Sequence, residues 1–364
     1  MIYRRMLRLI ALIGLPLATP CQTAPTAVPI PNDPLEMVTG TTQVVSKSAG
    51  RDAALQLLTR ARSSYELKSA GRGYDLKVSF TVTSGGLTEY DGDWEMEEIF
   101  FPKYGTRWTA KAASGYTTTQ IYVDNQHFGA GTSTTIPLRL HEARAALMAA
   151  IPTNTNRHSI RTSTGTYNGV TVTCLLLSGP DPVPTPSSGR RWDELEECID
   201  PQSGLLQVHS QVPGRYYGYD YTDAPKLGDR VLPRKVTVTE AGKTVSLIHV
   251  DSLTEVSEAD ASLFTATAEM KANGESVDMA QAQKLSVFPD SMPIAPGVTI
   301  KPVCVFGLFT PLGQIAEAHS LQPSDPNSQA AVEFAKAMNL FTPLASTGRP
   351  VQHFVFIIEK FVSH

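Results

Sequence analysis

Residues 74–82 have the clearest alternation of apolar and polar side chains in the sequence. Large apolar side chains stand at every second position from Tyr74 to Val82, and polar side chains stand between them. A period of two is typical of a β-strand with one buried face. Shorter segments of the same kind continue as far as Phe264, separated by turn residues, and they predict about ten strands.

Two segments have helical spacing instead. Residues 51–65 place Leu55, Leu58 and Tyr65 near one face of a helix, and residues 140–150 form a short helix rich in alanine and leucine. Strands that follow strands favour an antiparallel sheet over the parallel sheet of alternating strands and helices. The sequence therefore predicts an α+β fold, in which a curved antiparallel half-barrel of about ten strands surrounds a helix.

Two cysteines precede a predicted hairpin turn. Cys174 lies in the alternating segment 170–177, and Cys198 comes just before the turn sequence 200–204, in which Pro201 and Gly204 favour a bulged hairpin. The cysteines are thus expected on neighbouring strands. A Cys174–Cys198 disulfide is one interpretation and two buried free thiols is the other; an oxidising compartment favours the bond.

The N-terminus has the features of an export signal. Residues 1–21 have three arginines among the first eight positions and continue with a short apolar core, and residues 22–46 form a proline-rich tether. The mature protein is therefore predicted to be periplasmic or otherwise exported, with no transmembrane segment after signal removal. Cys21 is a candidate for lipid anchoring, but Pro20 stands where lipoprotein signals have a small residue, so free and anchored forms both remain open.

The pattern changes after residue 266. The predicted signal is 1–21, the predicted tether is 22–46 and the predicted half-barrel domain is 47–266. The polar, proline-containing residues 267–300 are predicted to be a linker. Residues 301–364 then predict two strands, a helix at 327–338 and a third strand. In that helix Ala331, Phe334, Ala335 and Met338 are expected to face inward.

Composition and charge exclude several kinds of site. The net charge is −4 and charged residues make up 18% of the 364 residues, without a basic run, so no nucleic-acid partner is expected. His141-Glu142 lacks the second histidine of a zinc helix, and no phosphate loop or nucleophile elbow occurs.

The remaining candidate side chains also give no catalytic pattern. Glu196 and Glu197 should point to opposite faces of a strand, which makes them poor candidates for a catalytic carboxylate pair. Cys304 is expected to be a buried structural thiol. We therefore predict no metal, no cofactor and no enzymatic activity; a hydrolase is a third alternative, which would need a Ser/His/Asp or metal cluster brought together by the fold.

Apolar strand positions are the main candidates for a binding site. They exceed what one helix easily covers, and a curled sheet with an uncovered apolar concave face can hold a lipid chain or another hydrophobic ligand. The alternative is that the same side chains pack against the two predicted helices as an ordinary core. The candidate ligand-binding residues are Leu76, Val78, Phe80, Trp94, Phe100, Trp108 and Tyr122.

Residues 47–266 resemble the LolA/LolB periplasmic lipoprotein-carrier fold, which is shared with envelope-stress regulators of the RseB type. The shared features are the leucine-rich helix that runs into Tyr65, the series of strands, the turn Asp200-Pro201-Gln202-Ser203-Gly204-Leu205-Leu206, the segment 232–236 and the ending Leu263-Phe264. The resemblance implies an unclosed barrel whose apolar interior takes acyl chains, without catalysis.

Residues 301–361 resemble the TonB C-terminal domain. The matching segments are 313–318, 330–336, 341–343 and 348–351, in the same order and at similar spacing. The sequence departs from the family at Asn339-Leu340, where the family usually has a tryptophan, and it lacks the family's transmembrane anchor and long spacer. The resemblance implies a docking module whose exposed strand edge takes a peptide.

Together these features predict a non-enzymatic exported envelope protein. Its half-barrel would bind a lipid or a lipoprotein acyl chain, and its TonB-like domain would dock an envelope protein partner. The alternative is a structural or regulatory interaction module of the envelope without a lipid ligand.

Overall fold

The structure, a computed structural model, describes residues 43–44, 48–83, 91–133, 136–148, 150–155, 158–179, 190, 192, 194–274, 283–286, 299–310, 312–338 and 353–363. The predicted signal, Cys21 and most of the tether lie outside these residues. No helix among the described residues is long and apolar enough to cross a membrane.

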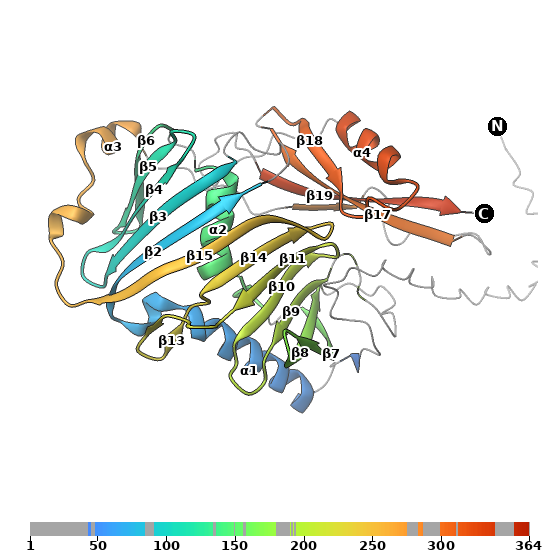
Figure 1. Cartoon of the computed structure of the whole chain (residues 1–364), viewed down its shortest axis with the longest axis horizontal. Coiled ribbons are helices and arrows are strands. Elements are labelled where there is room, and N and C mark those ends of the chain that lie inside the picture. The colour runs from blue at the N-terminus through green and yellow to red at the C-terminus, as the bar shows by residue number, and fades with distance from the viewer. Residues whose placement is uncertain are drawn as a thin grey trace, which may run out of the picture.

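A thirteen-stranded antiparallel sheet forms most of the molecule (Figure 1). Its strands, in spatial order, are β1 (Gln43–Val44), β7 (Ser159–Tyr167), β8 (Val170–Ser178), β9 (Leu195–Ile199), β10 (Leu206–Val212), β11 (Arg215–Asp220), β14 (Lys235–Glu240), β15 (Lys243–Val256), β2 (Gly73–Val82), β3 (Gly92–Phe101), β4 (Gly105–Ala112), β5 (Thr117–Val123) and β6 (Gln126–Gly131). In the described residues β1 and β6 each have one neighbour, so the sheet is curved but unclosed. The predicted half-barrel is confirmed, with more strands than the ten expected.

The pairing of β15 with β2 joins the two halves of the sheet. Ser246 lies opposite Val82 and Val256 lies opposite Gly73, which brings together segments more than 160 residues apart in the sequence. A small hairpin of β12 (Lys226–Leu227) and β13 (Arg230–Val231) extends from the lower edge of this sheet.

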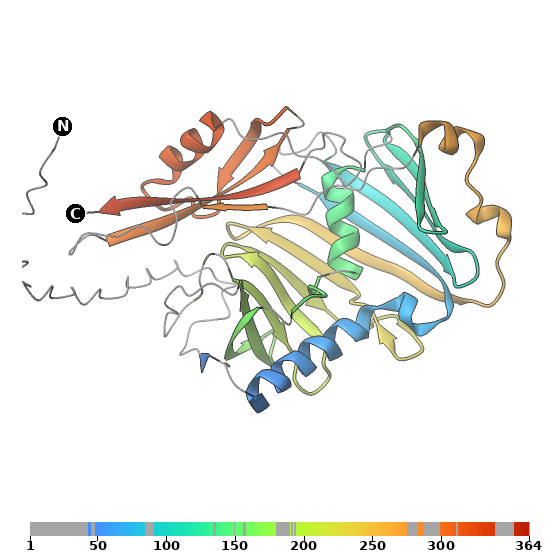
Figure 2. The same cartoon turned by 180° about the vertical axis from the view of Figure 1, so that it is seen from behind.

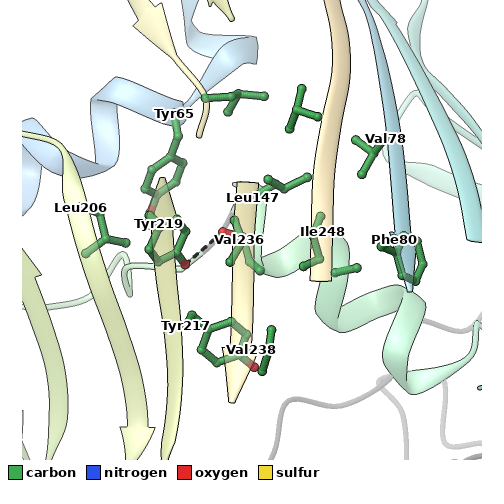
Figure 3. Close-up of a cluster of buried hydrophobic side chains, with 14 of the residues drawn as sticks. Tyr65, Val78, Phe80, Leu147, Leu206, Tyr217, Tyr219, Val236, Val238 and Ile248 are labelled. Carbon is green, nitrogen blue, oxygen red and sulfur yellow. Dashed lines mark hydrogen bonds between the residues drawn. The ribbon is translucent and has the colours of Figure 1, made fainter. Parts of the chain in front are cut away.

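Two helices cover the concave face, as Figure 2 shows from behind. They are α1 (Ser48–Tyr65) and α2 (Leu138–Met148), close to the predicted ranges 51–65 and 140–150. Leu58 and Tyr65 of α1 and Leu147 of α2 belong to one buried cluster with the inward side chains of the sheet. Figure 3 shows Tyr65 and Leu147 within this cluster. Burial of this apolar surface is the main stabilising contribution to the half-barrel.

The predicted disulfide and hairpin are confirmed. Cys174 and Cys198 are direct cross-strand partners on β8 and β9, and their sulfurs are bonded. Gly204 has φ +77° in the turn that leads from β9 to β10, where the pairing contains a register shift. Asp200 Oδ1 accepts a hydrogen bond from the Gln202 backbone N–H at 2.9 Å, which stabilises the turn.

A second, four-stranded sheet follows. Its spatial order is β16 (Gln283–Ser286), β19 (His353–Ser363), β17 (Thr299–Phe309) and β18 (Ile315–Ser320), and α4 (Ser328–Ala337) packs on one face. The predicted order of strand, strand, helix and strand is observed. Two further elements, α3 (Ala268–Asn273) and β16, lie within residues 267–300. The prediction that Phe334 faces inward is wrong, because its side chain is 48% exposed.

The opposite face of the second sheet contacts the half-barrel through a buried charged cluster. The guanidinium of Arg215 lies 4.7 Å from the centre of the Phe306 ring, and Arg215 and Arg139 bind the Glu240 carboxylate at 2.9 and 3.2 Å. His319 Nε2 lies 3.1 Å from the other oxygen of Glu240. Burial raises the pKa of Glu240, but the two arginines outweigh it and hold that pKa well below its ordinary value.

Candidate functional site

A pocket of about 460 Å³ opens between the end of α1, the short helix η1 (Leu67–Ala70), α2 and the start of β2. Its volume lies within the range of small-molecule sites. The lining side chains are Tyr65, Glu66, Leu67, Lys68, Ser69, Tyr74, His141, Arg144, Ala145 and Met148.

One side of α2 lines the pocket, and the neighbouring side packs in the core. The pocket-lining positions are spaced by three, one and three residues along the helix, so they share one side of it. The neighbouring side carries Leu140, Ala143 and Leu147, which are buried in the core of the half-barrel. On the facing side of the pocket, η1 ends at Gly71, whose φ of +67° favours glycine and turns the chain into β2.

A buried carboxylate, that of Glu98, lies beside the pocket and forms a charged cluster with Lys68 and Arg144, here called the pocket floor. Glu98 accepts a hydrogen bond from the Tyr74 hydroxyl at 2.8 Å and from Arg144 Nη2 at 2.6 Å, and Lys68 Nζ lies 3.8 Å from it. Burial raises the pKa of Glu98, but Arg144 and Lys68 outweigh this effect and lower it. Burial also lowers the pKa of Lys68, against the opposing effect of Glu98. The floor is therefore a charged cluster in partly desolvated surroundings.

Two aromatic rings position these cations. The Arg144 guanidinium lies 4.4 Å from the centre of the Trp108 ring, and Lys68 Nζ lies 5.6 Å from the centre of the Phe100 ring. Cation–π contacts of this kind hold the cationic groups in place at modest energetic gain. Phe100 and Trp108 are thus the two predicted ligand-binding residues that the structure brings next to the pocket.

The other predicted binding residues have different surroundings. Leu76, Val78, Phe80 and Trp94 lie on the concave face and are at most 3% exposed, packed in the core under α1 and α2. Tyr122 is 45% exposed near the edge of the sheet, where its hydroxyl hydrogen-bonds to Asn125. The interpretation that the apolar strand positions pack against two helices therefore accounts for the first four.

Sequence reasoning missed the charged residues of the pocket. One signal could have found them: Glu98 occupies an inward position of the alternating series that includes Trp94, Met96 and Phe100. A carboxylate at such a position needs cationic or hydrogen-bonding partners. Those partners, Lys68 and Arg144, come from elements far away in the sequence.

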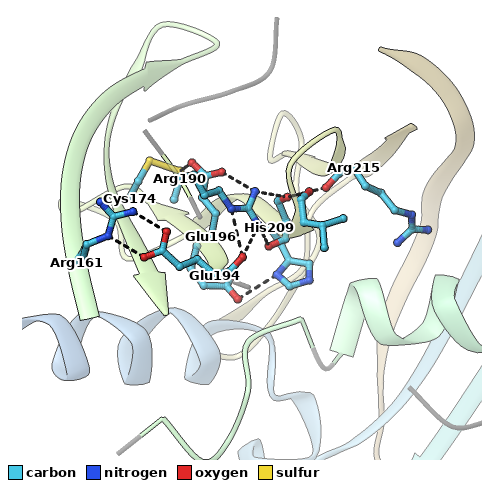
Figure 4. A network of polar contacts seen from close by, with 11 residues as sticks. Arg161, Cys174, Arg190, Glu194, Glu196, His209 and Arg215 are labelled. Carbon is cyan, nitrogen blue, oxygen red and sulfur yellow. Dashed lines mark hydrogen bonds and ion pairs between the residues drawn. A yellow bond between two sulfur atoms is a disulfide. The ribbon is translucent and has the colours of Figure 1, made fainter. Parts of the chain in front are cut away.

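A second polar cluster lies around the disulfide (Figure 4). Arg161 binds Glu194 at 2.6 Å and Arg190 binds Glu196 at 3.1 Å, while Glu197 pairs with His209 at 3.0 Å. The predicted opposite orientation of Glu196 and Glu197 agrees with these different partners. Burial raises the pKa of Glu196 to about 7, despite the lowering effect of Arg190.

This second cluster offers no access to a ligand. Its six ionic side chains are at most 7% exposed. Cys174, Glu196 and Cys198 form the one potential three-residue metal group found in the described part of the chain, but both sulfurs are bonded to each other. Cys304 is buried and takes no part in the disulfide, as expected. The ion pairs of the cluster compensate buried charges within the sheet.

No family model and no curated protein matches the chain. Several solved structures are similar to it at low identity. A LolA superfamily protein from Nitrosomonas europaea has 12% identity and a TM-score of 0.36, over 58% of this chain and 97% of that chain. A putative outer membrane lipoprotein-sorting protein domain from Vibrio parahaemolyticus has 7% identity and a TM-score of 0.36, over 59% and 95%. The MucA/MucB complex of Pseudomonas aeruginosa matches with 12% identity and a TM-score of 0.28, over 73% and 82%. With every TM-score below 0.5, these likenesses assign the chain to no family.

Proposed function

We propose that this protein is a non-enzymatic, exported envelope protein that binds the apolar chain of a lipid or lipoprotein. The pocket of about 460 Å³ beside α2 is the observation that carries this proposal. Tyr65, Leu67 and Met148 give it apolar walls, and it is lined by the two helices that cover the concave face of an unclosed sheet. The resemblance of residues 47–266 to the lipoprotein-carrier fold supports the same reading.

Phe100 and Trp108 extend the proposed binding surface below the charged floor. Leu76, Val78, Phe80 and Trp94 form the apolar core that supports this floor, and a ligand chain would reach them through movement of α2. In this proposal the seven candidate residues differ in role: two extend the binding surface, four support it from the core, and Tyr122 lies near the edge of the sheet.

Filling the pocket tests the proposal. Ala145 is half-buried and lines the pocket, so Ala145→Trp should remove most of the space and weaken displacement of a fluorescent fatty acid at least tenfold. Ala53→Trp introduces the same side chain at an exposed position of α1 and should leave binding unchanged. Native mass spectrometry of the purified protein should show a bound lipid that Ala145→Trp loses.

We further propose that the C-terminal sheet docks an envelope protein partner. Strand β18 has one neighbour among the described residues, and an exposed strand edge can accept an extended peptide. A photo-crosslinker at Glu317 on β18 should capture a partner in cells, whereas one at Glu333 on α4 should not. Equal crosslinking at both positions would refute docking at this edge.

An interaction module without a ligand is the second candidate function. The tight packing of the concave core favours it, because most inward side chains are already covered by α1 and α2. This candidate predicts that the purified protein carries no lipid and that Ala145→Trp and the wild type behave alike with the fluorescent fatty acid.

A further inference from the structure

We infer that the ligand of the pocket beside α2 is an amphiphile with one negatively charged headgroup, a carboxylate or a phosphate, held by Lys68 and Arg144. This inference rests on the proposed function and specifies the class of ligand. It is carried by the charge balance of the pocket, by the hydrogen-bonding groups that remain available there, and by the apolar walls around them.

The pocket floor has one more positive charge than negative charge. Lys68 and Arg144 both interact with a single carboxylate, that of Glu98. The other acidic residue of the lining, Glu66, is paired with Arg62 at 3.3 Å across one helical turn. Partly desolvated charges are stable when they are paired, so one further anion would complete the balance.

The two cations also retain hydrogen-bonding capacity. Arg144 donates from Nη2 to Glu98, and its side chain, which is 19% exposed, lines the pocket. Its buried Nε has no hydrogen-bond partner in the described part of the structure and becomes available to a ligand only if the guanidinium shifts. The guanidinium is held against the Trp108 ring, which fixes the plane of its donors. Lys68 lies at 3.8 Å from Glu98, beyond an ordinary hydrogen bond, and its ammonium carries three donors.

Partial burial makes Lys68 responsive to a second anion. Burial lowers its pKa, and the nearby Glu98 compensates only in part. Its side chain is still 47% exposed, so a headgroup entering from solvent can reach it without unfolding of η1. An anion placed between Lys68 and Arg144 gains two charge-assisted interactions, each stronger than a neutral hydrogen bond.

The rest of the lining suits the other end of an amphiphile. Tyr65, Leu67, Ala145 and Met148 surround the cationic groups with apolar surface, and methionine adapts to chains of varied shape. A fully hydrophilic anion would leave these walls in contact with water. A neutral lipid would leave the excess positive charge without a partner.

Binding of matched single-chain ligands tests the headgroup. The probes are oleate, oleoyl lysophosphatidylglycerol, oleyl alcohol and oleylamine, each competing with a fluorescent fatty acid below its micelle concentration at pH 7.5. We expect at least one of the two anions to bind ten times or more tightly than oleyl alcohol, and oleylamine to bind weakest. Preference for oleate indicates a free fatty acid as the source of the headgroup, and preference for the lysophospholipid indicates a membrane lipid.

Substitutions at Lys68 test the contact with the headgroup separately from the contacts with the apolar chain. Lys68→Met keeps an unbranched side chain of similar length but removes its charge, and should lower the ratio of anion to alcohol affinity at least tenfold. Lys68→Arg keeps the charge and should retain most of that ratio. Lys111→Met removes an exposed lysine outside the pocket and should leave the ratio unchanged. Equal binding of anions and oleyl alcohol would overturn the headgroup inference and leave the proposed function standing. Absence of binding by all four probes would overturn both.

Discussion

Removing the disulfide between β8 and β9 should cost the protein a measurable and predictable amount of stability. The two cysteines are separated by 24 positions in the sequence. In the chain-entropy model, opening a loop of this length raises the conformational entropy of the unfolded chain by about 11.6 cal/mol/K, which is about 3.5 kcal/mol at 25 °C. Replacing both Cys174 and Cys198 by alanine should lower the free energy of unfolding by this amount, and the loss of two fully buried sulfurs adds to it.

Urea unfolding with and without reductant measures this contribution. Oxidised wild type should be more stable than both the reduced wild type and the double alanine variant. Reductant should have no effect on the double variant, and its effect should persist in a Cys304→Ala variant, because Cys304 is not part of the bond. If oxidised and reduced wild type differ by less than about 1 kcal/mol, the loop-entropy reasoning is refuted.

Three further predictions concern the core, the domain interface and the hairpin. Glu240→Gln should lower the free energy of unfolding by about 3–5 kcal/mol at pH 7, because it leaves two buried arginines underpaired. The folded-state pKa of Glu240 is depressed, so the extra stability of the wild type over the variant should be complete above about pH 4.5 and should shrink as the pH falls further. Thermal unfolding of both proteins at pH 7, 5 and 3 measures this difference. Phe80→Ala should cost about 3–5 kcal/mol, because the ring is buried and stacked on Trp94, while Phe80→Leu should cost much less in the same urea titration. Asp200→Ala should cost about 1 kcal/mol by loss of the hydrogen bonds in the hairpin turn; no change in the urea midpoint would contradict this.

Local patterns made much of the fold predictable. Alternation from Tyr74 to Val82 identified β2, and helical spacing identified α1 and α2 within a few residues. The alternation at 170–177 and the turn after Cys198 led to the expectation that Cys174 and Cys198 lie on neighbouring strands, as they do. Each of these features depends on side chains that are close in the sequence, where periodicity and turn chemistry act directly.

Long-range pairing was outside the reach of such patterns. The junction of β15 with β2 depends on register between distant strands, and no local signal specifies which strands become neighbours. Phe334 was placed inward because it continues the apolar stripe of its helix. The sheet beneath α4 covers the side with Ala331 and Ala335, and Phe334 lies outside the contact.

The candidate site was only partly predictable for a similar reason. Phe100 and Trp108 were expected to contact a ligand, and they lie directly below the cations of the pocket. Lys68 and Arg144 are unremarkable in the sequence, because ordinary surface positions on helices carry lysine and arginine. Their importance comes from Glu98, which the strand pattern turns toward the interior and the fold brings beneath both of them.

Helix α2 takes part in two distant contacts at once. Arg139 and Glu142 bind the charged cluster under the second sheet, and Arg144 and Met148 line the pocket, all within eleven residues of one rigid element. A ligand that displaces this helix must alter the distances in both places. If the proposed ligand and the proposed partner both bind, the two equilibria share a free-energy term, and a partner that restrains α2 would change ligand affinity by the same factor by which the ligand changes affinity for the partner.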